Sequence, residues 1–389
     1  MAPLDRWLAW APVLERIYQE ELGRSAFSDP EAFVNWTYHW RESGHDEQWV
    51  LDRIRESPEW RARHPGNEPP AASQPPLQHG LVQITDASDG TLVPRTYSYW
   101  PNALIREDGI YCFFPFTDGV RFFRIRDRII DRLGHLVSAL GETGEGRYWN
   151  HDGFLYYVVG PQLKRFNPLN GDTQTVFDIA ALHPNCRLWQ CHSSDDGRTH
   201  SGTVQQIVAD GAYPSIASIV SNIGSVTIFP AQGQLDESHL DRSGRFLVIL
   251  ENHDNRIIDL ETGDSTVIAD AEGAVAHADC GDGFIVGEDN HRGACIRWNL
   301  KQLARGPDIL FRTWNMGHVS VRGGRCLVSD QTSLSLAALD GSGVTPILEH
   351  GMTGSGYDAQ VQGSLDPSGQ VATCLSNRSG RLEAYLLTL

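Results

Sequence analysis

Apolar and polar positions follow two different patterns along this chain, with a change near residue 65. Before that point apolar residues recur at intervals of three and four, which predicts two or three short helices within residues 5–64. Beyond residue 80, short apolar runs follow a polar residue and a glycine, which predicts strands joined by tight turns. The segment between them contains five prolines, as a semi-rigid linker does. We therefore predict a helical module over 1–64, a linker over 65–79 and a β domain over 80–389.

One motif recurs seven times in the β domain: an acidic or polar residue, a turn glycine and an apolar strand. The seven turn glycines are Gly109, Gly153, Gly197, Gly244, Gly283, Gly324 and Gly369. Their separations of 39 to 47 residues are typical of propeller blades, each of about four short strands. The sequence therefore predicts an all-β fold, a seven-bladed β-propeller, preceded by a small α-helical domain. We expect the run 81–84 to pair into the last blade and close the ring.

Charge and cysteine content narrow the function classes. The formal net charge of −17 argues against a nucleic-acid partner or an anionic membrane surface, because both need clustered Lys and Arg. An acidic ligand would therefore need a local positive site.

The seven cysteines are scattered without a CxxC pair, so we expect buried thiols rather than a disulfide framework. The N-terminus lacks a basic stretch followed by an apolar core, and we expect a cytoplasmic protein.

The strand before each turn glycine is expected to line the central channel, and in four consecutive blades it carries a histidine. His192 and His239 lie five residues before their glycine, and His277 and His318 lie six residues before theirs. Histidine makes up 15 of 389 residues, so four occurrences in seven equivalent slots exceed chance. The alternative is a structural histidine repeated by duplication, but propellers of that kind carry a recurrent Trp-Asp partner that is absent here.

Neutral imidazoles around one axis can converge on a divalent cation. Imidazole suits manganese, zinc or iron better than calcium. The last blade adds Gln360 and Gln362, which strand alternation places on one face, and either amide oxygen would complete a metal shell. We therefore predict a bound divalent metal ion, manganese or zinc rather than calcium.

The first two blades offer an aromatic and polar wall in place of histidines. Its side chains are Tyr99, Trp100, Asn102, Arg147, Tyr148, Trp149 and His151. Such a wall suits stacking against a sugar ring and hydrogen bonding to its hydroxyl groups. Trp100 and Trp149 are equally compatible with packing inside the blades, and Tyr148 and His151 are the stronger functional candidates of this wall.

Together these motifs resemble the seven-bladed propeller polysaccharide lyases, which include oligogalacturonate lyases and ulvan-type lyases. The likeness is carried by Cys191-His192 to Gly197-Arg198, Ser238-His239 to Gly244-Arg245, Ala276-His277, Gly317-His318 and the stretch 362–369. The resemblance implies cleavage of a uronic-acid linkage by β-elimination on an acidic oligosaccharide. In such a reaction a metal ion or Arg neutralises the substrate carboxylate, a base removes the C5 proton and an acid protonates the O4 leaving group.

The resemblance also implies a role for each candidate residue. The implied metal shell is His239, His277 and His318 with Gln360 or Gln362. The implied base or acid is His192, helped by His151, Tyr148 or Tyr213, and Arg147 contacts the substrate carboxylate. The implied sugar-binding residues are Tyr99, Trp100, Asn102 and Trp149. Oligogalacturonate lyases place a paired-histidine HxH in the last blade, where this chain has Gln362-Gly363-Ser364. Ulvan-like or rhamnosyl-glucuronate substrates therefore stay open beside pectic ones.

Other functions remain open at this point. A calcium-dependent propeller lactonase or hydrolase would favour Glu, Asn and Asp ligands, whereas this channel favours His. A non-catalytic propeller would serve as a carbohydrate- or protein-binding platform. The front segment resembles small helical modules of bacterial extracellular and phage-associated proteins through the stretches 18–24, 36–40 and 57–60. It is therefore a candidate docking element for a protein partner, or else an aromatic-rich helical cap.

Overall fold

The computed structural model of the chain divides into two compact units, residues 1–75 and 76–389, and each is described here by itself. The structure describes residues 3–28, 51, 54–55, 63, 80–93, 99–136, 146–167, 170–208, 212–222, 225–313, 316–330, 333–350 and 361–389. The predicted linker 65–79 and Gln360 lie outside these residues, so the linker boundaries stay a prediction.

The first unit is built around one amphipathic helix, α1 (Pro3–Leu22), followed by the 3-10 turn η1 (Ala26–Ser28). One stripe of the helix is buried because its apolar residues recur every three or four positions. The small core consists of Leu14, Ile17, Tyr18, Leu22, Ala26 and Ile54. In the described part of the chain, no helix is both long enough and apolar enough to cross a bilayer.

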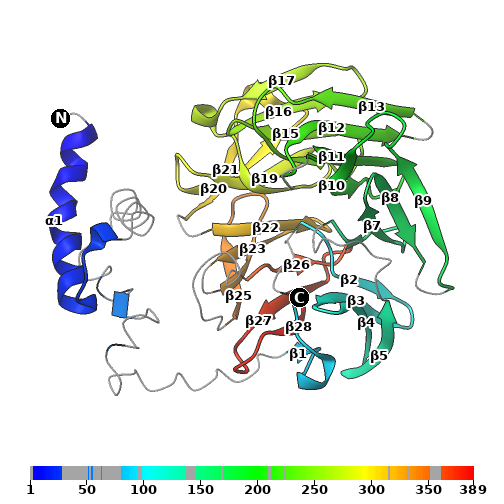
Figure 1. Ribbon diagram of the computed structural model, residues 1–389, viewed down its shortest axis with the longest axis horizontal. Helices are drawn as coiled ribbons and strands as arrows, with labels where there is room; N and C mark the ends of the chain where they lie inside the picture. Colours follow the sequence, from blue (N-terminus) through cyan, green and yellow to red (C-terminus); the bar gives the residue numbers. More distant parts are fainter. Residues whose placement is uncertain are drawn as a thin grey trace. The chain divides into compact units, whose positions relative to one another are not determined.

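The second unit is a seven-bladed β-propeller, as predicted, with seven four-stranded antiparallel sheets (Figure 1). Blades 1 to 3 contain β2 (Ala103–Arg106), β3 (Gly109–Phe116), β4 (Gly119–Arg126) and β5 (Ile129–Leu136); β6 (Tyr148–Trp149), β7 (Leu155–Val159), β8 (Gln162–Phe166) and β9 (Thr173–Asp178); and β10 (Cys186–Ser193), β11 (Thr199–Gln206), β12 (Ser215–Asn222) and β13 (Ser225–Pro230).

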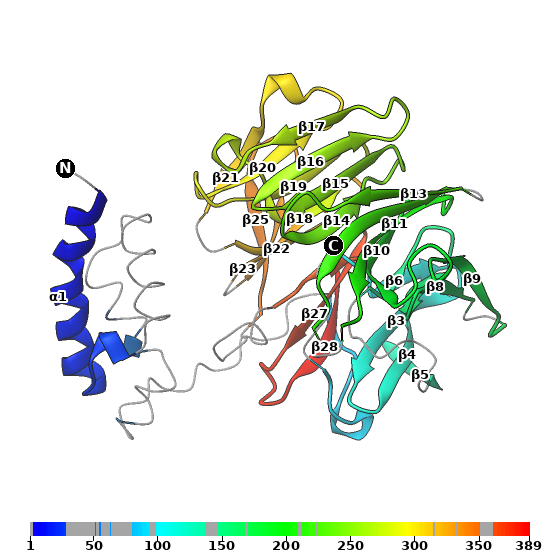
Figure 2. The same ribbon diagram turned by 45° about the horizontal axis from the view of Figure 1, so that its top comes forward.

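Blades 4 to 6 follow the same order, seen from a second direction in Figure 2. They contain β14 (Leu235–Leu240), β15 (Phe246–Glu251), β16 (Asp254–Asp259) and β17 (Ser265–Ile268); β18 (Ala276–Cys280), β19 (Phe284–Asp289), β20 (Ala294–Asn299) and β21 (Asp308–Arg312); and β22 (Met316–Arg322), β23 (Arg325–Asp330), β24 (Ser333–Ala337) and β25 (Val344–Glu349). Short 3-10 turns lie at η2 (Ala87–Asp89), η3 (Asp270–Glu272) and η4 (Leu303–Arg305).

Blade 7 is assembled from both ends of the propeller. It contains β26 (Ser364–Leu365), β27 (Val371–Ser376) and β28 (Glu383–Thr388), and β1 (Leu81–Gln83) pairs with β28, with Leu81 opposite Leu387. This confirms the predicted closure, which removes two exposed strand edges. The middle strands are buried because neighbouring blades cover both of their faces. All six residues of β15 are buried, whereas the outermost strand β17 buries only Ile268.

The recurring turn explains the period of the sequence. All seven predicted turn glycines have positive φ angles, between 65° and 141°, which L side chains rarely adopt. At Gly369 a Cβ atom would lie 2.5 Å from the carbonyl oxygen of Arg322, so no larger residue fits there. The acidic residue of the motif also has a local role: Asp241 accepts hydrogen bonds from the backbone N–H groups of Arg245 (2.8 Å) and Phe246 (2.7 Å). All seven cysteines are free and buried, as expected.

Candidate functional site

The four predicted channel histidines lie on the first strands of blades 3 to 6, at two different spacings from the turn. His192 and His239 stand two residues before the residue that closes the turn, because their turns hold four residues. His277 and His318 stand four residues before it, because their turns hold two. The turn glycine therefore does not mark the same strand position in all four blades, and a single histidine slot stays a prediction.

A β-bulge interrupts each of these four strands beside its histidine. The pairing register shifts between Trp189 and His192, between Leu235 and Glu237, between Ala276 and Asp279, and between Met316 and His318. His277 itself has a φ angle of +46°, which is unusual for a residue with a side chain. Register shifts also occur in other strand pairs, such as β11–β12 and β20–β21, so the bulges change where these side chains point without by themselves marking a site.

The imidazoles form two pairs that are joined by a tyrosine. The ring centroids of His192 and His239 are 4.6 Å apart, and those of His277 and His318 are 4.7 Å apart. The Tyr99 ring contacts one member of each pair, at 5.3 Å from His239 and 5.7 Å from His318. The channel therefore does bring all four histidines together, but an aromatic ring links the two pairs where we expected a metal ion.

The buried polar atoms of this cluster test the metal prediction. His192 Nε2, His239 Nδ1 and Gln362 Oε1 are buried and have no hydrogen-bond partner, which is the kind of atom that a bound cation or polar ligand satisfies. His239 Nε2 lies 3.0 Å from Glu237 Oε1. However, no group of three or more His, Cys, Asp or Glu side chains among the described residues is placed to hold one metal ion. The three-histidine shell does not fit a metal as it stands, and the metal ion stays a prediction.

Burial keeps part of the cluster neutral. The pKa of His192 is lowered by burial, and further by His239, Arg242 and Arg322. Burial also lowers the pKa of His318 to about 3, with a smaller contribution from His277. Both rings are therefore uncharged at pH 7. His192, His239 and His318 are at most 1% exposed, whereas His277 is half-buried, so His277 is the member that a ligand can reach.

A buried charge cluster, Arg242–Asp279–Arg322, underlies the histidines. Asp279 is fully buried and lies 2.7 Å from Arg242 Nη2, and it also accepts a hydrogen bond from Arg322 Nη1. Arg322 donates in addition to the Tyr99 carbonyl oxygen, which fixes the tyrosine between the histidine pairs. Burial lowers the pKa of Arg322 to about 10, with a contribution from Arg242. Sequence reasoning missed this cluster, although a carboxylate inside the apolar strand β18 was a signal for it.

The predicted sugar-binding wall is mostly interior. Trp100 stacks on His192 at 5.6 Å and donates its indole N–H to the Cys191 carbonyl oxygen. Trp149 is 1% exposed and packs against the phenylalanines of blade 1, so it is a core residue. Asn102 and Tyr99 are also buried. As the structure stands, these four side chains do not present an open surface to a sugar.

The predicted helper residues are dispersed. The Tyr148 hydroxyl is buried 2.7 Å from Ser193 Oγ, and burial raises its pKa. Arg147 is also buried, which lowers its pKa to about 10. His151 is 39% exposed at a glycine turn, where its Nε2 lies 3.7 Å from Asp195. Tyr213 is exposed and stacks on Arg187, with the guanidinium carbon 3.6 Å from the ring centroid.

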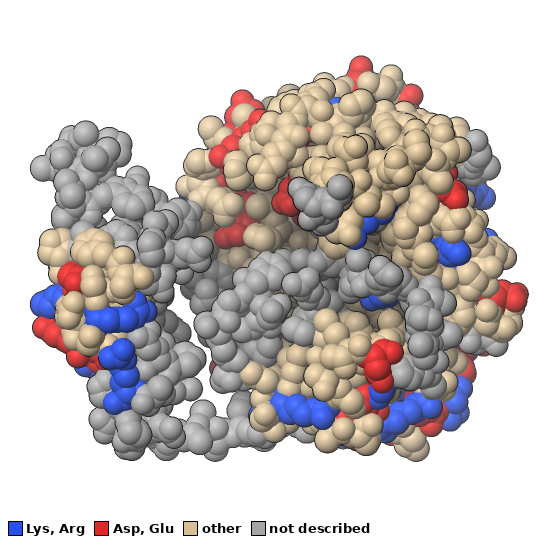
Figure 3. All heavy atoms as spheres, viewed as in Figure 1, with Lys and Arg blue, Asp and Glu red and all other residues tan. Residues whose placement is uncertain are grey.

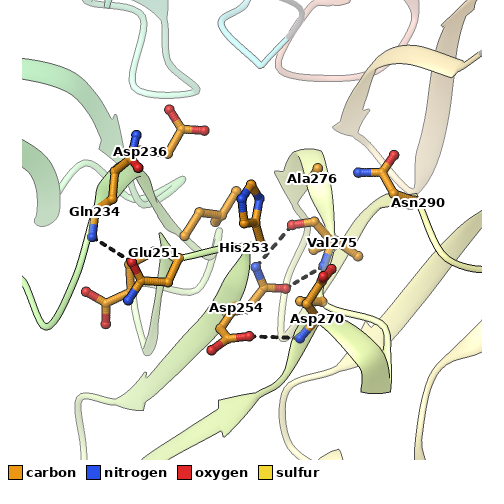
Figure 4. Close-up of a pocket in the computed structure, with 13 residues that line it drawn as sticks. Gln234, Asp236, Glu251, His253, Asp254, Asp270, Val275, Ala276 and Asn290 are labelled. Atoms are coloured by element: carbon orange, nitrogen blue, oxygen red, sulfur yellow. Dashed lines mark hydrogen bonds between the residues drawn. The ribbon is translucent and has the colours of Figure 1, made fainter. Parts of the chain in front are cut away.

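A pocket of about 250 Å³ lies between blades 4 and 5 (Figure 4). It is at the end of the strands opposite the glycine turns, and its lining comes from the start of β14, the β15–β16 turn, the segment before β18 and the β19–β20 turn. His253 stands between Gln234, Asp236 and Glu251 on one side and Ala276 and Asn290 on the other (Figure 4). His277 is not among the lining residues, but it interacts electrostatically with Asp236, which lines the pocket.

The pocket is acidic, which sequence reasoning did not anticipate. Its lining includes Asp236, Glu251, Asp254 and Asp270, against the single imidazole of His253. The pKa of Asp236 is raised by partial burial and by Glu237, and lowered in part by the nearby His277. Carboxylates and amides of this kind accept hydrogen bonds from sugar hydroxyl groups.

The outer surface carries mixed charge. On the face shown in Figure 3, Lys and Arg side chains along the lower edge are interleaved with Asp and Glu. Arginines of β4 and β5 form ion pairs, such as Arg124 with Asp131 at 3.0 Å and Arg132 with Asp86 at 2.7 Å. The described residues of this face therefore form no uniform basic surface.

Comparisons with known proteins place the fold. No protein-family model matches the chain, and no curated protein matches it by sequence. Among solved structures, it is similar to an oligogalacturonate lyase from Vibrio parahaemolyticus, with a TM-score of 0.58 and 10% identity over 79% of this chain and 93% of that one. An oligogalacturonate lyase in complex with manganese gives a TM-score of 0.56 and 11% identity, over 75% and 89% of the two chains.

A second kind of propeller is also similar. The C-terminal WD40 domain of Sif2 gives a TM-score of 0.50 and 12% identity, over 79% of this chain and 98% of that domain. At these identities the likeness shows the propeller fold, and the structural neighbours include both lyases and a WD40 domain.

Proposed function

We propose that this propeller is a polysaccharide lyase that cleaves a uronic-acid linkage by β-elimination. The observation that carries the proposal is the position of His277, the channel histidine that is not fully buried, which contacts the buried His318 and interacts electrostatically with the pocket residue Asp236. The fold likeness to two oligogalacturonate lyases supports it. Pectic, ulvan-like and rhamnosyl-glucuronate oligosaccharides are the proposed substrates.

The reaction needs a base and an acid close to one sugar ring. In the proposal His277 accepts the C5 proton, the electron pair forms the C4–C5 double bond, and the C4–O4 bond breaks. In the proposal Asp236 protonates the departing O4, a role supported by its raised pKa, its interaction with His277 and its place in the pocket lining. The neutral His318 packs against His277 and holds the ring in place without adding charge.

The substrate carboxylate must also be neutralised. The pocket lining offers four carboxylates and only one imidazole, so a uronate binds there most readily when a cation accompanies it. No step of the proposal passes through a metal ion, because the described ligands do not form a shell. A divalent cation, manganese above all, remains the predicted cofactor to be tested.

The test is ultraviolet absorbance, since elimination creates a conjugated unsaturated uronate and hydrolysis does not. We expect a rise with at least one of the three substrate classes, and a loss of about 10²-fold or more in the initial rate for His277→Ala. Asp282→Asn is the control, because Asp282 lies in the same blade, is 72% exposed and does not line the pocket. Parallel reactions with Mn²⁺ and with a chelator test the metal prediction, which a rate increase with Mn²⁺ supports.

A second function is favoured by a specific observation. His192, His239 and His318 are almost fully buried in ring-on-ring contacts, as expected of a structural cluster. In that case the propeller is a non-catalytic carbohydrate- or protein-binding platform, and the similarity to a WD40 domain supports this alternative. No absorbance change with any substrate, with or without Mn²⁺, would favour it over the lyase.

A further inference from the structure

A second pocket, of about 260 Å³, lies between blades 2 and 3 and shares no lining residue with the pocket of Figure 4. Arg165 on β8 forms one side of it, and the β10–β11 turn contributes Arg198. His200 on β11 forms part of the wall, and Thr175 and Ser221 add hydroxyl groups. Nothing in the proposed lyase reaction uses these residues.

The charge of this pocket is opposite to that of the protein. Two guanidinium groups and an imidazole line it, and no carboxylate is among its lining residues, in a chain with a net charge of −17. Two carboxylates adjoin the lining. Asp196 accepts a hydrogen bond from Ser194 Oγ at 2.6 Å and lies 3.8 Å from Arg198 Nε, and Asp152 lies against Gly197 and accepts a hydrogen bond from the Tyr156 hydroxyl at 2.6 Å. They offset part of the positive charge from outside the pocket wall.

The arginine on β8 is held in a fixed position. Its guanidinium carbon stacks 4.4 Å from the centroid of the Phe154 ring, and its Nε and Nη2 atoms donate to Gln174 Oε1 at 3.0 and 2.8 Å. A guanidinium that is already oriented loses little conformational entropy when it binds a planar or tetrahedral oxyanion. These contacts hold the Arg165 side chain in the wall of the pocket, so it does not move freely over the surface.

His200 connects this pocket to the propeller interior. It is 5% exposed, and its Nδ1 lies 2.7 Å from Ser193 Oγ, which in turn lies 2.7 Å from the Tyr148 hydroxyl. Burial lowers the pKa of His200 to about 4, and the charge of Arg165 lowers it further, whereas Asp196 raises it. An anion in the pocket would relieve this repulsion, so the imidazole is a sensitive reporter of its occupancy.

We propose that this pocket binds an oxyanion, the carboxylate or sulfate group of an acidic saccharide, through Arg165, Arg198 and His200. Charge-assisted hydrogen bonds from guanidinium groups are the strongest that such an anion can form here. The site is separate from the proposed lyase reaction, and its occupancy can be measured in a protein without any lyase activity.

The test is an NMR titration of the full-length protein, followed through the imidazole resonances of His200, which a His200→Gln variant assigns. The probes are sodium sulfate and sodium glucuronate, with sodium chloride at matched ionic strength as the reference. We expect a saturable shift with at least one oxyanion, and an apparent Kd about tenfold higher in Arg165→Gln and in Arg198→Gln. Arg198 is 71% exposed, so its substitution leaves the fold intact.

The matched control is Arg305→Gln, because Arg305 is 65% exposed and lies 3.2 Å from an aspartate in its own turn, as Arg198 lies near Asp196. It should bind both anions like the wild type. Tighter binding of glucuronate indicates a saccharide-borne anion, and tighter binding of sulfate indicates a sulfate ester or free inorganic anion. A response no different from that to chloride, or an equal loss in Arg305→Gln, would overturn the proposal. Neither result depends on whether the lyase reaction occurs.

Discussion

Replacing Asp279 by Asn should destabilise the propeller more than any surface change. Asp279 is fully buried between Arg242 and Arg322 and also accepts backbone hydrogen bonds from Cys280 (2.9 Å) and Val321 (2.7 Å). Asparagine has nearly the same shape but only one acceptor oxygen. Its NH₂ group must therefore face either an arginine or a backbone N–H group. In both cases two hydrogen-bond donors face each other and the hydrogen bond at that position is lost.

The expected loss in the free energy of unfolding is about 3–5 kcal/mol, the usual cost of removing one partner from a buried ion pair. It arises because two guanidinium groups are left in the interior without their counter-charge. The measurement is urea unfolding at pH 7, followed by circular dichroism, with the wild type and the variant compared by their midpoints and slopes.

Asp282→Asn provides the matched control. Asp282 lies three residues along the same blade, is 72% exposed and lies 3.8 Å from Lys301, so its change should stay within about 0.5 kcal/mol. Adding Arg322→Met to Asp279→Asn should then recover part of the loss, because it removes one unpaired charge. A loss below about 1 kcal/mol for Asp279→Asn, or no recovery in the double variant, would refute this account of the cluster.

Two other predictions follow from burial. His192→Ala should lower the free energy of unfolding by about 2 kcal/mol, because it leaves a cavity between Trp100 and His239. His151 is exposed, so His151→Ala should change the free energy of unfolding little. Urea unfolding of both variants checks this. Burial, aided by Asp289, raises the pKa of Glu288 from 4.5 to about 7. Between pH 4.5 and pH 7 the folded protein therefore binds one more proton at this residue than the unfolded chain does. The stability of the fold consequently falls as the pH rises through this window. Glu288→Gln should therefore be more stable than the wild type at pH 8, by up to about 3 kcal/mol, and equal to it below pH 4.5, and equal stabilities at pH 8 would contradict this.

The fold could be predicted from the sequence because one local requirement repeats. Each blade turns at a glycine with positive φ, and only glycine adopts that conformation at little cost, so the turn leaves a visible mark every 39 to 47 residues. The strand β1 could also be assigned to the last blade, since its apolar run would otherwise leave an open edge. These features depend on neighbouring residues along the chain, which is why a pattern reveals them.

The site could be predicted only in part, because its geometry depends on turn length and bulges. The four channel histidines could be recognised in the sequence, but the spacing of each one from its turn follows from four-residue turns in blades 3 and 4 and two-residue turns in blades 5 and 6. Each bulge adds one residue to one strand without any sequence signature as clear as a turn glycine. Asp236 and Arg322 were missed because they take part through contacts between blades, which spacing along one blade does not show.

Burial is what separates a catalytic histidine from an architectural one in this channel. An imidazole at 0–1% exposure cannot touch a sugar unless its neighbours move, and moving Trp100 or Tyr99 would break the contacts that hold His192 and His239. His277 is under no such constraint, because it is half-buried and interacts with Asp236, which lines a pocket. If the lyase proposal holds, substitutions at the buried histidines should act on stability first, whereas substitution at His277 should act on turnover with little effect on stability. A variant of His277 that unfolds and one of His192 that stays folded but inactive would reverse this order and move the reaction into the buried cluster.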